Sequence, residues 1–351
     1  MFGVLAVTAA CGARPTSHQP PNRVTPALGD TPVAVTASAS AAPTDSLSGA
    51  ATPTATAGLP LTPVGFTCRL PIVTTRNQTA EAGFISFPSG SYAADPAGNI
   101  KSKALGLAYD RAYNRWLPVD WRLVSDDGAH YAYVIYSGDP NTPGAYSAIH
   151  VVDVASGTDR IVSRSGQYVP NDYVGNGVYL SAWIGGHDGP GPQIGWVIDP
   201  STGSIRALSG GQKYGYSVGS GAGWRTDYNT ADPTVHQGMT GANRITRVDL
   251  ASGTESTWLY RQGADWLDVV GFDRAGHPIV ATGTGQAISV LVLTDASHRS
   301  QLFSTTGFIR GGVEDSHGIW FTDDSATYLY SAASGFHKVA ATGGQIAGGC
   351  H

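Results

Sequence analysis

The sequence predicts an all-β fold built from repeated four-stranded units, and three observations lead to this prediction. Glycine (46 residues) and proline (21 residues) are frequent, while charged residues make up only 13% of the 351-residue chain. This composition suits many short strands joined by tight turns. A turn pattern of the form Asp-x-x-x-Gly returns along the chain, and Cys68 and Cys350 bracket the region that has this texture.

The turn pattern recurs with a period typical of propeller blades. It begins at Asp153, Asp199 and Asp249, with a degenerate copy at Asp295 and another at Ser331, so the starts lie 46, 50, 46 and 36 residues apart. A period in the forties with four strands per unit is the signature of a β-propeller. No segment after residue 66 has the apolar spacing of a helix over three turns, so we expect little helix.

The expected strands follow one another in the same order within each unit. In the clearest unit, an inner strand at 121–125 is followed by a turn at 126–128, a second strand at 129–136, a third at 149–153 and an outer edge at 160–163. Later strands are expected at 174–180, 194–198, 245–248, 256–260, 269–272, 278–280, 288–293, 318–321 and 328–330. These segments make five units, and 84–87 with 116–119 supplies a sixth. We therefore predict a six-bladed β-propeller over 66–351, with seven blades as the alternative.

Some of these units resemble known families. Residues 124–128 with the downstream Tyr131-Ala-Tyr133, and residues 152–158, look like blades of the TolB-like and WD40-like β-propellers of bacterial envelopes. Residues 315–321 are similar to a strand pattern of streptogramin-lyase-like and other six- or seven-bladed rings. The whole of 66–351 resembles propeller lipoproteins of high-GC soil bacteria. The resemblance implies the fold. The lyase family's catalytic histidine and glutamate have no secure match here, so it implies no catalytic residue.

The N-terminal part of the chain has a different composition. A short apolar run ends in Val7-Thr-Ala-Ala-Cys11-Gly, which is similar to the bacterial lipobox and implies a diacylglycerol on Cys11. The run is too short to span a bilayer and lacks a positively charged start. We interpret 1–11 as a truncated lipoprotein signal peptide, with a plain apolar N-terminus as the alternative. Residues 12–65 hold nine prolines and no aromatic residue, so we expect a disordered linker.

These features together predict an exported protein of the cell envelope, anchored to a membrane through Cys11 and facing outward. In an oxidising compartment Cys68 and Cys350 are expected to form a disulfide, with two unpaired thiols as the alternative. If the ring closes, its first and last blades meet, and the two cysteines come close together.

Few residues indicate chemistry. The 21 basic and 26 acidic residues give a net charge of -5 without a Lys/Arg cluster, which argues against nucleic-acid binding. Zinc and calcium spacings are missing, and no Gly-x-Ser-x-Gly elbow occurs with triad partners in a credible order, so no cofactor or metal is expected. Four histidines in or beside strands are expected to hydrogen-bond with the backbone: His130, His150, His277 and His317. His317, with Asp315 and Glu314, is also a weak catalytic candidate in a central channel.

Longer loops are the candidate binding site. The loops 137–147, 185–193 and 226–243 each connect a second strand to a third, so they share one face of the ring. The candidate binding residues on that face are Asp139, Tyr146, His187, Asp188, Tyr228, Asp232 and His236. We predict a monomeric, non-catalytic binding module for a protein, peptide or glycan. An envelope lyase or hydrolase with a site near His317, and a scaffold or sensor domain, are the alternatives.

Overall fold

A computed structural model describes most of the chain after its N-terminal segment. The described residues are 54–55, 58–76, 79–104, 106–137, 146–175, 177–183, 193–208, 217–219, 221–227, 242–262, 266–285 and 287–351. They belong to one compact unit, Ala42–His351. The fold is described for this unit by itself.

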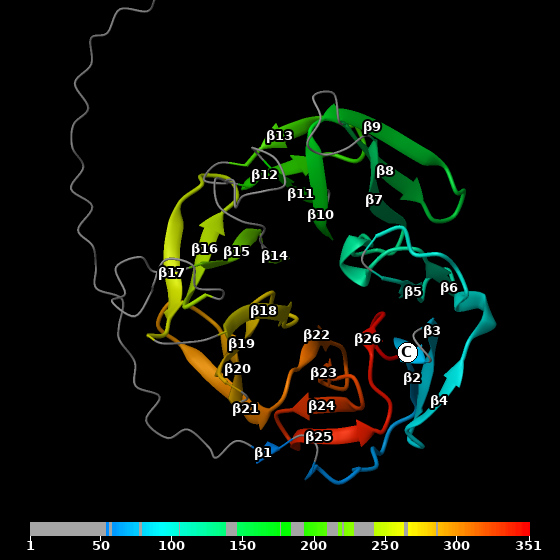
Figure 1. Cartoon of the computed structure of the whole chain (residues 1–351), viewed down its shortest axis with the longest axis vertical. Coiled ribbons are helices and arrows are strands. Elements are labelled where there is room, and N and C mark those ends of the chain that lie inside the picture. Colours follow the sequence, from blue (N-terminus) through cyan, green and yellow to red (C-terminus); the bar gives the residue numbers. More distant parts are fainter. Residues whose placement is uncertain are drawn as a thin grey trace, which may run out of the picture. The chain divides into compact units, whose positions relative to one another are not determined.

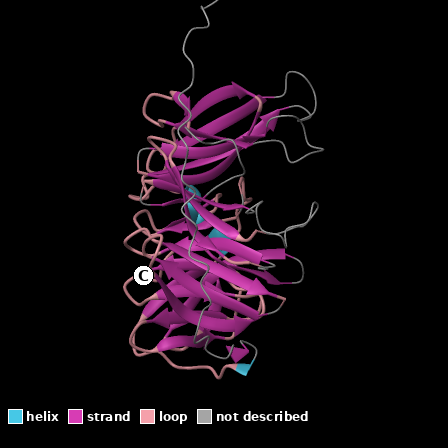
Figure 2. Cartoon of the chain, turned by 90° about the vertical axis from the view of Figure 1, so that its left-hand side faces the viewer, coloured by secondary structure: helices cyan, strands magenta, loops and turns pink. Residues whose placement is uncertain are grey.

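Strands dominate the described residues (Figure 2). The helical elements with defined bounds are two three-residue 3-10 helices, η2 (Pro96–Gly98) and η3 (Trp121–Leu123). Within these ranges, no helix is long and apolar enough to cross a membrane. The expected all-β class is confirmed.

The sheets follow one another around a ring (Figure 1). Three of them are antiparallel and four-stranded, and in two of these three the strands lie side by side in chain order. The first contains β10 (Gln167–Val174), β11 (Gly177–Trp183), β12 (Gln193–Ile198) and β13 (Ile205–Ala207). The second contains β14 (Ser217–Gly219), β15 (Ala222–Asp227), β16 (Arg244–Asp249) and β17 (Glu255–Tyr260).

A nine-stranded sheet follows, and it consists of two similar halves and one added strand. The halves meet at a single parallel pair, Phe272 with Val313, between their first strands. One half is β18 (Trp266–Phe272), β19 (Pro278–Thr284), β20 (Ala287–Leu293) and β21 (Arg299–Thr306). The other is β22 (Arg310–Glu314), β23 (Ile319–Thr322), β24 (Thr327–Ser331) and β25 (Gly335–Ala340). The short β1 (Thr54–Ala55) pairs with β21 in parallel.

Three smaller groups complete the described strands. One sheet has the order β26 (Gln345–Ile346), β2 (Cys68–Arg76), β3 (Thr79–Phe87) and β4 (Ser91–Ala94). A two-stranded hairpin is formed by β5 (Ala108–Asp110) and β6 (Arg115–Leu117). A three-stranded sheet is formed by β7 (His130–Ser137), β8 (Tyr146–Asp153) and β9 (Asp159–Ser165).

Apolar side chains fill the space between neighbouring sheets. The β7–β9 sheet and the β10–β13 sheet contribute side chains to a single buried cluster. Successive side chains of a strand point to opposite faces of its sheet, so alternate residues reach the cluster. Its members are Ala132, Val134, Ile149, Val151, Val162, Tyr168, Tyr173, Val178, Leu180 and Ile198. This face-to-face packing of successive sheets is what makes the all-β fold propeller-like.

The predicted turns are observed, because their chemistry is local. In the turn that begins at Asp153, the amide of Gly157 donates to the Asp153 carbonyl at 2.9 Å, and Gly157 has φ +72°. The Asp153 carboxylate accepts from the Ser156 amide at 2.7 Å. A left-handed φ of this kind favours glycine, and the turns ending at Gly203 and Gly253 repeat it with φ +71° and +73°.

One expected strand is wrong, and two others differ from the structure in their bounds or their sheet. Residues 121–125 were expected to be an inner strand, but the Asp120 carboxylate caps a 3-10 turn there by accepting from the Arg122 amide at 2.9 Å. Residues 174–180 contain a turn at Gly175, with φ +54°, so they belong to β10 and β11. The segment 116–119 is in a different sheet from 84–87, and its strand β6 ends before Pro118, which has no N–H to donate.

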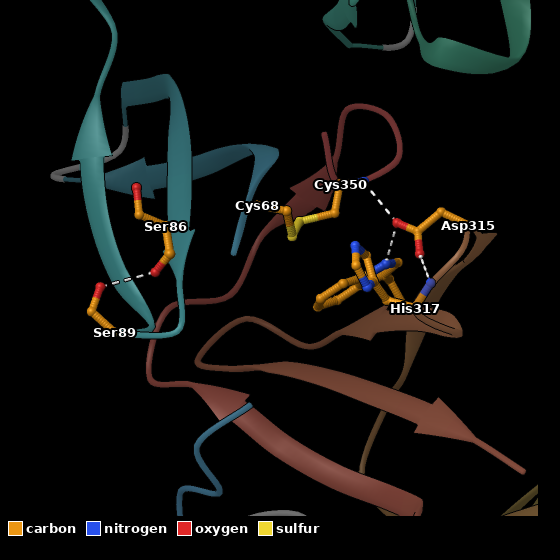
Figure 3. The surroundings of a disulfide bond; sticks show 7 residues. Cys68, Ser86, Ser89, Asp315, His317 and Cys350 are labelled. Carbon is orange, nitrogen blue, oxygen red and sulfur yellow. Dashed lines mark hydrogen bonds between the residues drawn. A yellow bond between two sulfur atoms is a disulfide. The ribbon is translucent and has the colours of Figure 1, made fainter. Parts of the chain in front are cut away.

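The two ends of the ring meet in one sheet. The C-terminal β26 pairs with β2 through Ile346 with Ile72, and His351 exchanges two backbone hydrogen bonds with Arg69 (2.8 and 3.1 Å). The predicted disulfide between Cys68 and Cys350 is present, with a Cα–Cα distance of 5.7 Å (Figure 3). The ring is therefore closed both by strand pairing and by a covalent bond.

The end of the predicted 12–65 linker packs on the outer strands. Besides the β1–β21 pairing, Leu61 forms a bridge with Lys338 of β25, and the Thr62 amide donates to the Lys338 carbonyl at 2.8 Å. Leu59 packs against the buried cluster of the nine-stranded sheet. The apolar side chains in this segment give it something to bury, so ordered structure begins before the expected start at Phe66. The remaining linker residues, 12–53 and 56–57, lie outside the described ranges.

Candidate functional site

A cavity of about 760 Å³ lies at the centre of the ring. Its wall is built from η3 and the turn after it, from β5, from the first strands β10, β14, β18 and β22, and from the residues after β26. Each group of strands thus contributes residues of its innermost strand, or of a turn next to it, to the cavity wall. A volume of this size is in the range of small-molecule and cofactor sites.

The cavity lies at the short-turn end of the inner strands. It is lined by the last residues of β10 and β14, up to Val174 and Gly219, and these strands continue into β11 and β15 through short turns. Because β10 and β11 are antiparallel, the connection from β11 to β12 begins at the opposite end of that sheet. The cavity is therefore at the opposite end of this sheet from Trp183, where β11 ends and the connection to β12 begins.

The cavity wall is apolar with charged groups set into it. Trp121, Phe272 and several valines supply the apolar surface. Five carboxylates and two guanidinium groups also line it. The charged residues are Asp110, Asp126, Asp127, Asp172, Glu314, Arg111 and Arg122.

One ion pair and the hydrogen bond beside it connect three elements of the wall. Arg122 of η3 donates to both carboxylate oxygens of Asp172 in β10, at 2.8 and 2.9 Å, and also to the Ser217 hydroxyl of β14 at 3.0 Å. The Val218 amide donates to the same carboxylate at 3.0 Å. Burial raises the pKa of Asp172, although Arg122 opposes the rise. This bidentate pair ties three neighbouring groups of strands together at the centre.

A smaller cavity of about 190 Å³ lies against the same ion pair. It shares Arg122, Ser217 and Val269 with the main cavity and adds Asp268 of β18. Solvent reaches the Asp268 side chain, but the surrounding protein removes much of its bulk water, and this burial raises the pKa of Asp268. Arg122 therefore borders both the larger and the smaller cavity.

A groove of about 500 Å³ continues from the main cavity. The two share Ser125, Asp126, Asp127 and Tyr173, and the groove extends to His130, Gly175 and residues 199–201. The Ser125 hydroxyl donates to Asp127 at 2.7 Å and lowers the pKa of that carboxyl. The Ser201 hydroxyl, together with backbone amides, lowers the pKa of Asp199 to about 2. The groove floor therefore stays anionic well into the acidic range.

The weak catalytic candidates do not lie together in the cavity. Glu314 lines it, and its carboxylate accepts from the Arg274 amide at 2.5 Å. Asp315 instead lies beside the disulfide, where it accepts from the amides of His317 and Cys350, each at 2.8 Å (Figure 3). The His317 ring stacks on Phe66 with 3.9 Å between centroids. Neither Asp315 nor His317 is a cavity-lining residue.

Most candidates of the long-loop face fall outside the described residues. Tyr146, at the start of β8, is described and is 45% exposed. The others, together with the predicted lipidation site at Cys11, lie in ranges that the structure does not describe: Asp139, His187, Asp188, Tyr228, Asp232 and His236.

Two of the four candidate histidines lie within hydrogen-bond distance of an aspartate. The His150 Nδ1 atom lies 2.8 Å from Asp159, and the His277 Nδ1 atom lies 2.9 Å from Asp273. In the part of the chain with defined placement, no group of three or more His, Cys, Asp or Glu side chains is arranged to hold a metal ion.

The charged wall of the cavity was not found from the sequence. Arg122 and Asp172 are far apart in the chain and meet only because consecutive sheets place their inner strands side by side. Asp110 gives no local signal either, because it ends a three-residue strand. The sequence predicted the turn at 126–128, but it did not indicate that Asp126 and Asp127 line a cavity.

No protein-family model and no curated protein sequence matches the chain. Several solved structures resemble it. An oligogalacturonate lyase in complex with manganese is 10% identical with a TM-score of 0.44, over 75% of this chain and 71% of that one. An uncharacterized protein of Listeria monocytogenes EGD-e is 8% identical with a TM-score of 0.41, over 82% and 87%.

An acylaminoacyl peptidase of Pyrococcus horikoshii is 9% identical with a TM-score of 0.42, over 60% of this chain. The chain spans only 37% of that peptidase. Similarity at this level carries no argument about substrate or activity, and the propeller-like arrangement rests on the sheets themselves.

Proposed function

We propose that this chain is a non-catalytic binding module that takes an extended ligand at the short-turn end of its ring. The observation that carries the proposal is the continuity of the central cavity with the groove, through four shared lining residues. Together they offer an apolar cavity with charged groups in its wall and a polar path that continues from it. A peptide, either free or at the end of a protein, fits this shape better than a compact metabolite.

Binding rather than turnover is proposed because the Ser125, Ser217 and Asp172 side chains of the wall are held by neighbouring residues. The Ser125 hydroxyl donates to Asp127, and the Ser217 hydroxyl accepts from Arg122. Asp172 accepts from Arg122 and from the Val218 amide. Groups fixed in this way shape and orient a ligand, whereas a nucleophile needs an adjacent base to activate it.

We also propose six as the number of blades. Val124 forms an isolated bridge with Tyr131 of β7, so it supplies an inner edge to the β7–β9 sheet. With this residue every blade has four strands, the two halves of the nine-stranded sheet counting as two blades. The β5–β6 hairpin is then an insertion, and a seventh blade arises only if this hairpin is counted separately.

We propose an exported, lipid-anchored location for the module. The support is the lipobox-like run that ends at Cys11, together with the disulfide, which is typical of oxidising compartments. A mass measurement of the mature N-terminus in a bacterium that expresses the natural precursor tests this proposal, and globomycin treatment of the same cells should make the uncleaved precursor accumulate. A mature protein without a lipid on Cys11 contradicts it.

Filling the cavity mouth tests the binding proposal. Ala112 lines the cavity, lies in the β5–β6 turn and is exposed, so Ala112→Trp adds an indole there without entering the core. Ala155→Trp is the matched control, because Ala155 is equally exposed in the β8–β9 turn and lines neither cavity nor groove.

A library of short peptides and small organic molecules is screened by thermal shift against the wild type and both variants. We expect ligands that raise the melting temperature of the wild type and of Ala155→Trp but not of Ala112→Trp. If every stabilising ligand acts equally on all three proteins, the central cavity is not the binding site.

A further inference from the structure

Asp110 has an unsatisfied carboxylate oxygen in the wall of the proposed site. The residue ends β5, lines the cavity and is only 6% exposed. Its Oδ1 atom accepts from the Ala112 amide at 2.8 Å, while its buried Oδ2 atom has no hydrogen-bond partner within the described structure. A buried carboxylate oxygen without a partner is costly, so a hydrogen bond donated by a ligand would offset this cost.

Gly128 makes room for this carboxylate. A Cβ atom at residue 128 would lie 2.9 Å from Oδ1 and 3.1 Å from Oδ2 of Asp110, and the residue has φ +72°. Glycine is therefore required here both by its backbone conformation and by the side chain above it. The turn at 126–128 and the β5–β6 hairpin together fix the position of the Asp110 carboxylate.

The charge of the wall favours a cation. Of the two guanidinium groups, Arg122 is already paired with Asp172, which leaves Arg111 against Asp110, Asp126, Asp127 and Glu314. The groove adds Asp199 to this excess of negative charge. An anionic ligand would meet repulsion along the whole path, and a neutral one would leave the excess uncompensated.

The apolar part of the wall restricts what carries the positive charge. Trp121, Phe272 and the valines offer surface to an apolar body rather than to a bare inorganic ion. No described cluster of acidic and histidine side chains is suited to a metal ion.

We infer that the ligand of this site is an organic cation, in which an ammonium or guanidinium group on an apolar body donates a hydrogen bond to Oδ2 of Asp110. The inference rests on the proposed function and names the chemical class of its ligand. A peptide fits the site with a basic side chain or its N-terminal amine at Asp110 and with further basic residues along Asp126, Asp127 and Asp199. A free amine with an aromatic body would occupy the central cavity and bind Asp110 without reaching the groove.

Charge-reversed peptides test the inference directly. The probe is a tetrapeptide of alternating phenylalanine and lysine with a fluorescein at its C-terminus, and its partners carry glutamate or glutamine in place of lysine. An N-acetylated form and unlabelled phenethylamine, used as a competitor, distinguish a basic side chain, a peptide N-terminus and a small amine. Binding is measured by fluorescence anisotropy at low ionic strength.

Asp110→Asn is the decisive variant, because it removes the charge but keeps an Oδ1 acceptor for the Ala112 amide. Asp324→Asn is the matched control, since Asp324 is exposed and its partner Arg310 lies outside the cavity lining. Melting temperatures of both variants verify that they fold.

We expect the lysine peptide to bind at least tenfold more tightly than the glutamate and glutamine peptides. Asp110→Asn should weaken the lysine peptide about tenfold or more, as for loss of a hydrogen bond to a charged group. Asp324→Asn should leave its affinity within about twofold. If phenethylamine displaces the lysine peptide, small amines also bind at Asp110. If N-acetylation weakens the lysine peptide, the group that binds at Asp110 is the peptide N-terminus.

Equal binding of the three peptides, or an unchanged affinity in Asp110→Asn, overturns the inference. If a neutral or anionic ligand from the screen loses binding in Ala112→Trp, the proposed function stands and the cationic ligand class is wrong. If no ligand depends on the cavity mouth, both are wrong.

Discussion

Removing the disulfide is expected to lower stability mainly through the unfolded chain. The strand pairs between β26 and β2, and the backbone hydrogen bonds between Arg69 and His351, remain when both cysteines are replaced by serine. The folded ring therefore keeps its closure. The unfolded chain, in contrast, loses a cross-link between residues separated by 282 positions.

The magnitude follows from loop-closure entropy. For a loop of that length the chain-entropy relation gives about 5.6 kcal/mol at 25 °C, and removal of native disulfides typically costs roughly 2–5 kcal/mol. A domain of this size changes its melting temperature by about 2 °C per kcal/mol. The double variant Cys68→Ser, Cys350→Ser should melt about 4–11 °C below the wild type.

Calorimetry and urea titration of the oxidised wild type, the reduced wild type and the double variant provide the assay. Reduction and replacement should give the same loss, and the urea m-value should rise because the uncrosslinked chain exposes more surface when it unfolds. A fall in melting temperature below about 2 °C, with an unchanged m-value, refutes the reasoning and assigns closure to the strand pairs alone.

Three further predictions follow from buried and turn residues. Arg225 is fully buried and donates to Asp227 and Glu255, so Arg225→Met should cost about 3–5 kcal/mol in urea unfolding, while Glu255→Gln, at the more exposed partner, should cost less than about 1 kcal/mol; equal losses would contradict this. The folded-state pKa of Asp199 is about 2, below its unfolded value, so its charge stabilises the fold above the ordinary aspartate range and ceases to do so as the pH falls through about 2. Asp199→Asn should therefore melt below the wild type at pH 6, with a difference that shrinks toward pH 2; a constant difference in a melting series argues against it. Gly157 has φ +72° and open space around its Cβ position, so Gly157→Ala should cost roughly 1 kcal/mol from backbone conformation alone, and a neutral change in chemical unfolding would show that the turn relaxes.

The sequence predicted the fold where its signals are local or repeated. The turn from Asp153 to Gly157 is specified by a carboxylate acceptor and a left-handed glycine within five residues, so it could be found without the structure. The disulfide could be found because only two cysteines bracket the repeats. The inner strand expected at 121–125 failed because one cap at Asp120 outweighs the β-like composition of the segment.

The central cavity could not be predicted because the contacts that join its walls are not local. Arg122 reaches Asp172 across 50 positions, and Asp110 reaches Gly128 from a separate hairpin. Loop length directed attention to the face with long connections, whereas the described cavity lies at the short-turn end of the inner strands. Only the order of the sheets around the ring places these side chains together.

The sharing of one sheet by β2 and β26 also has a consequence for biogenesis. Translation produces β2 before the blades and β26 after them, so the sheet that contains β2 lacks an edge strand until β26 has been made. The blades between them can form in order, but the ring remains an open arc until then. Ring closure therefore follows the synthesis of every blade and depends on the arrival of β26.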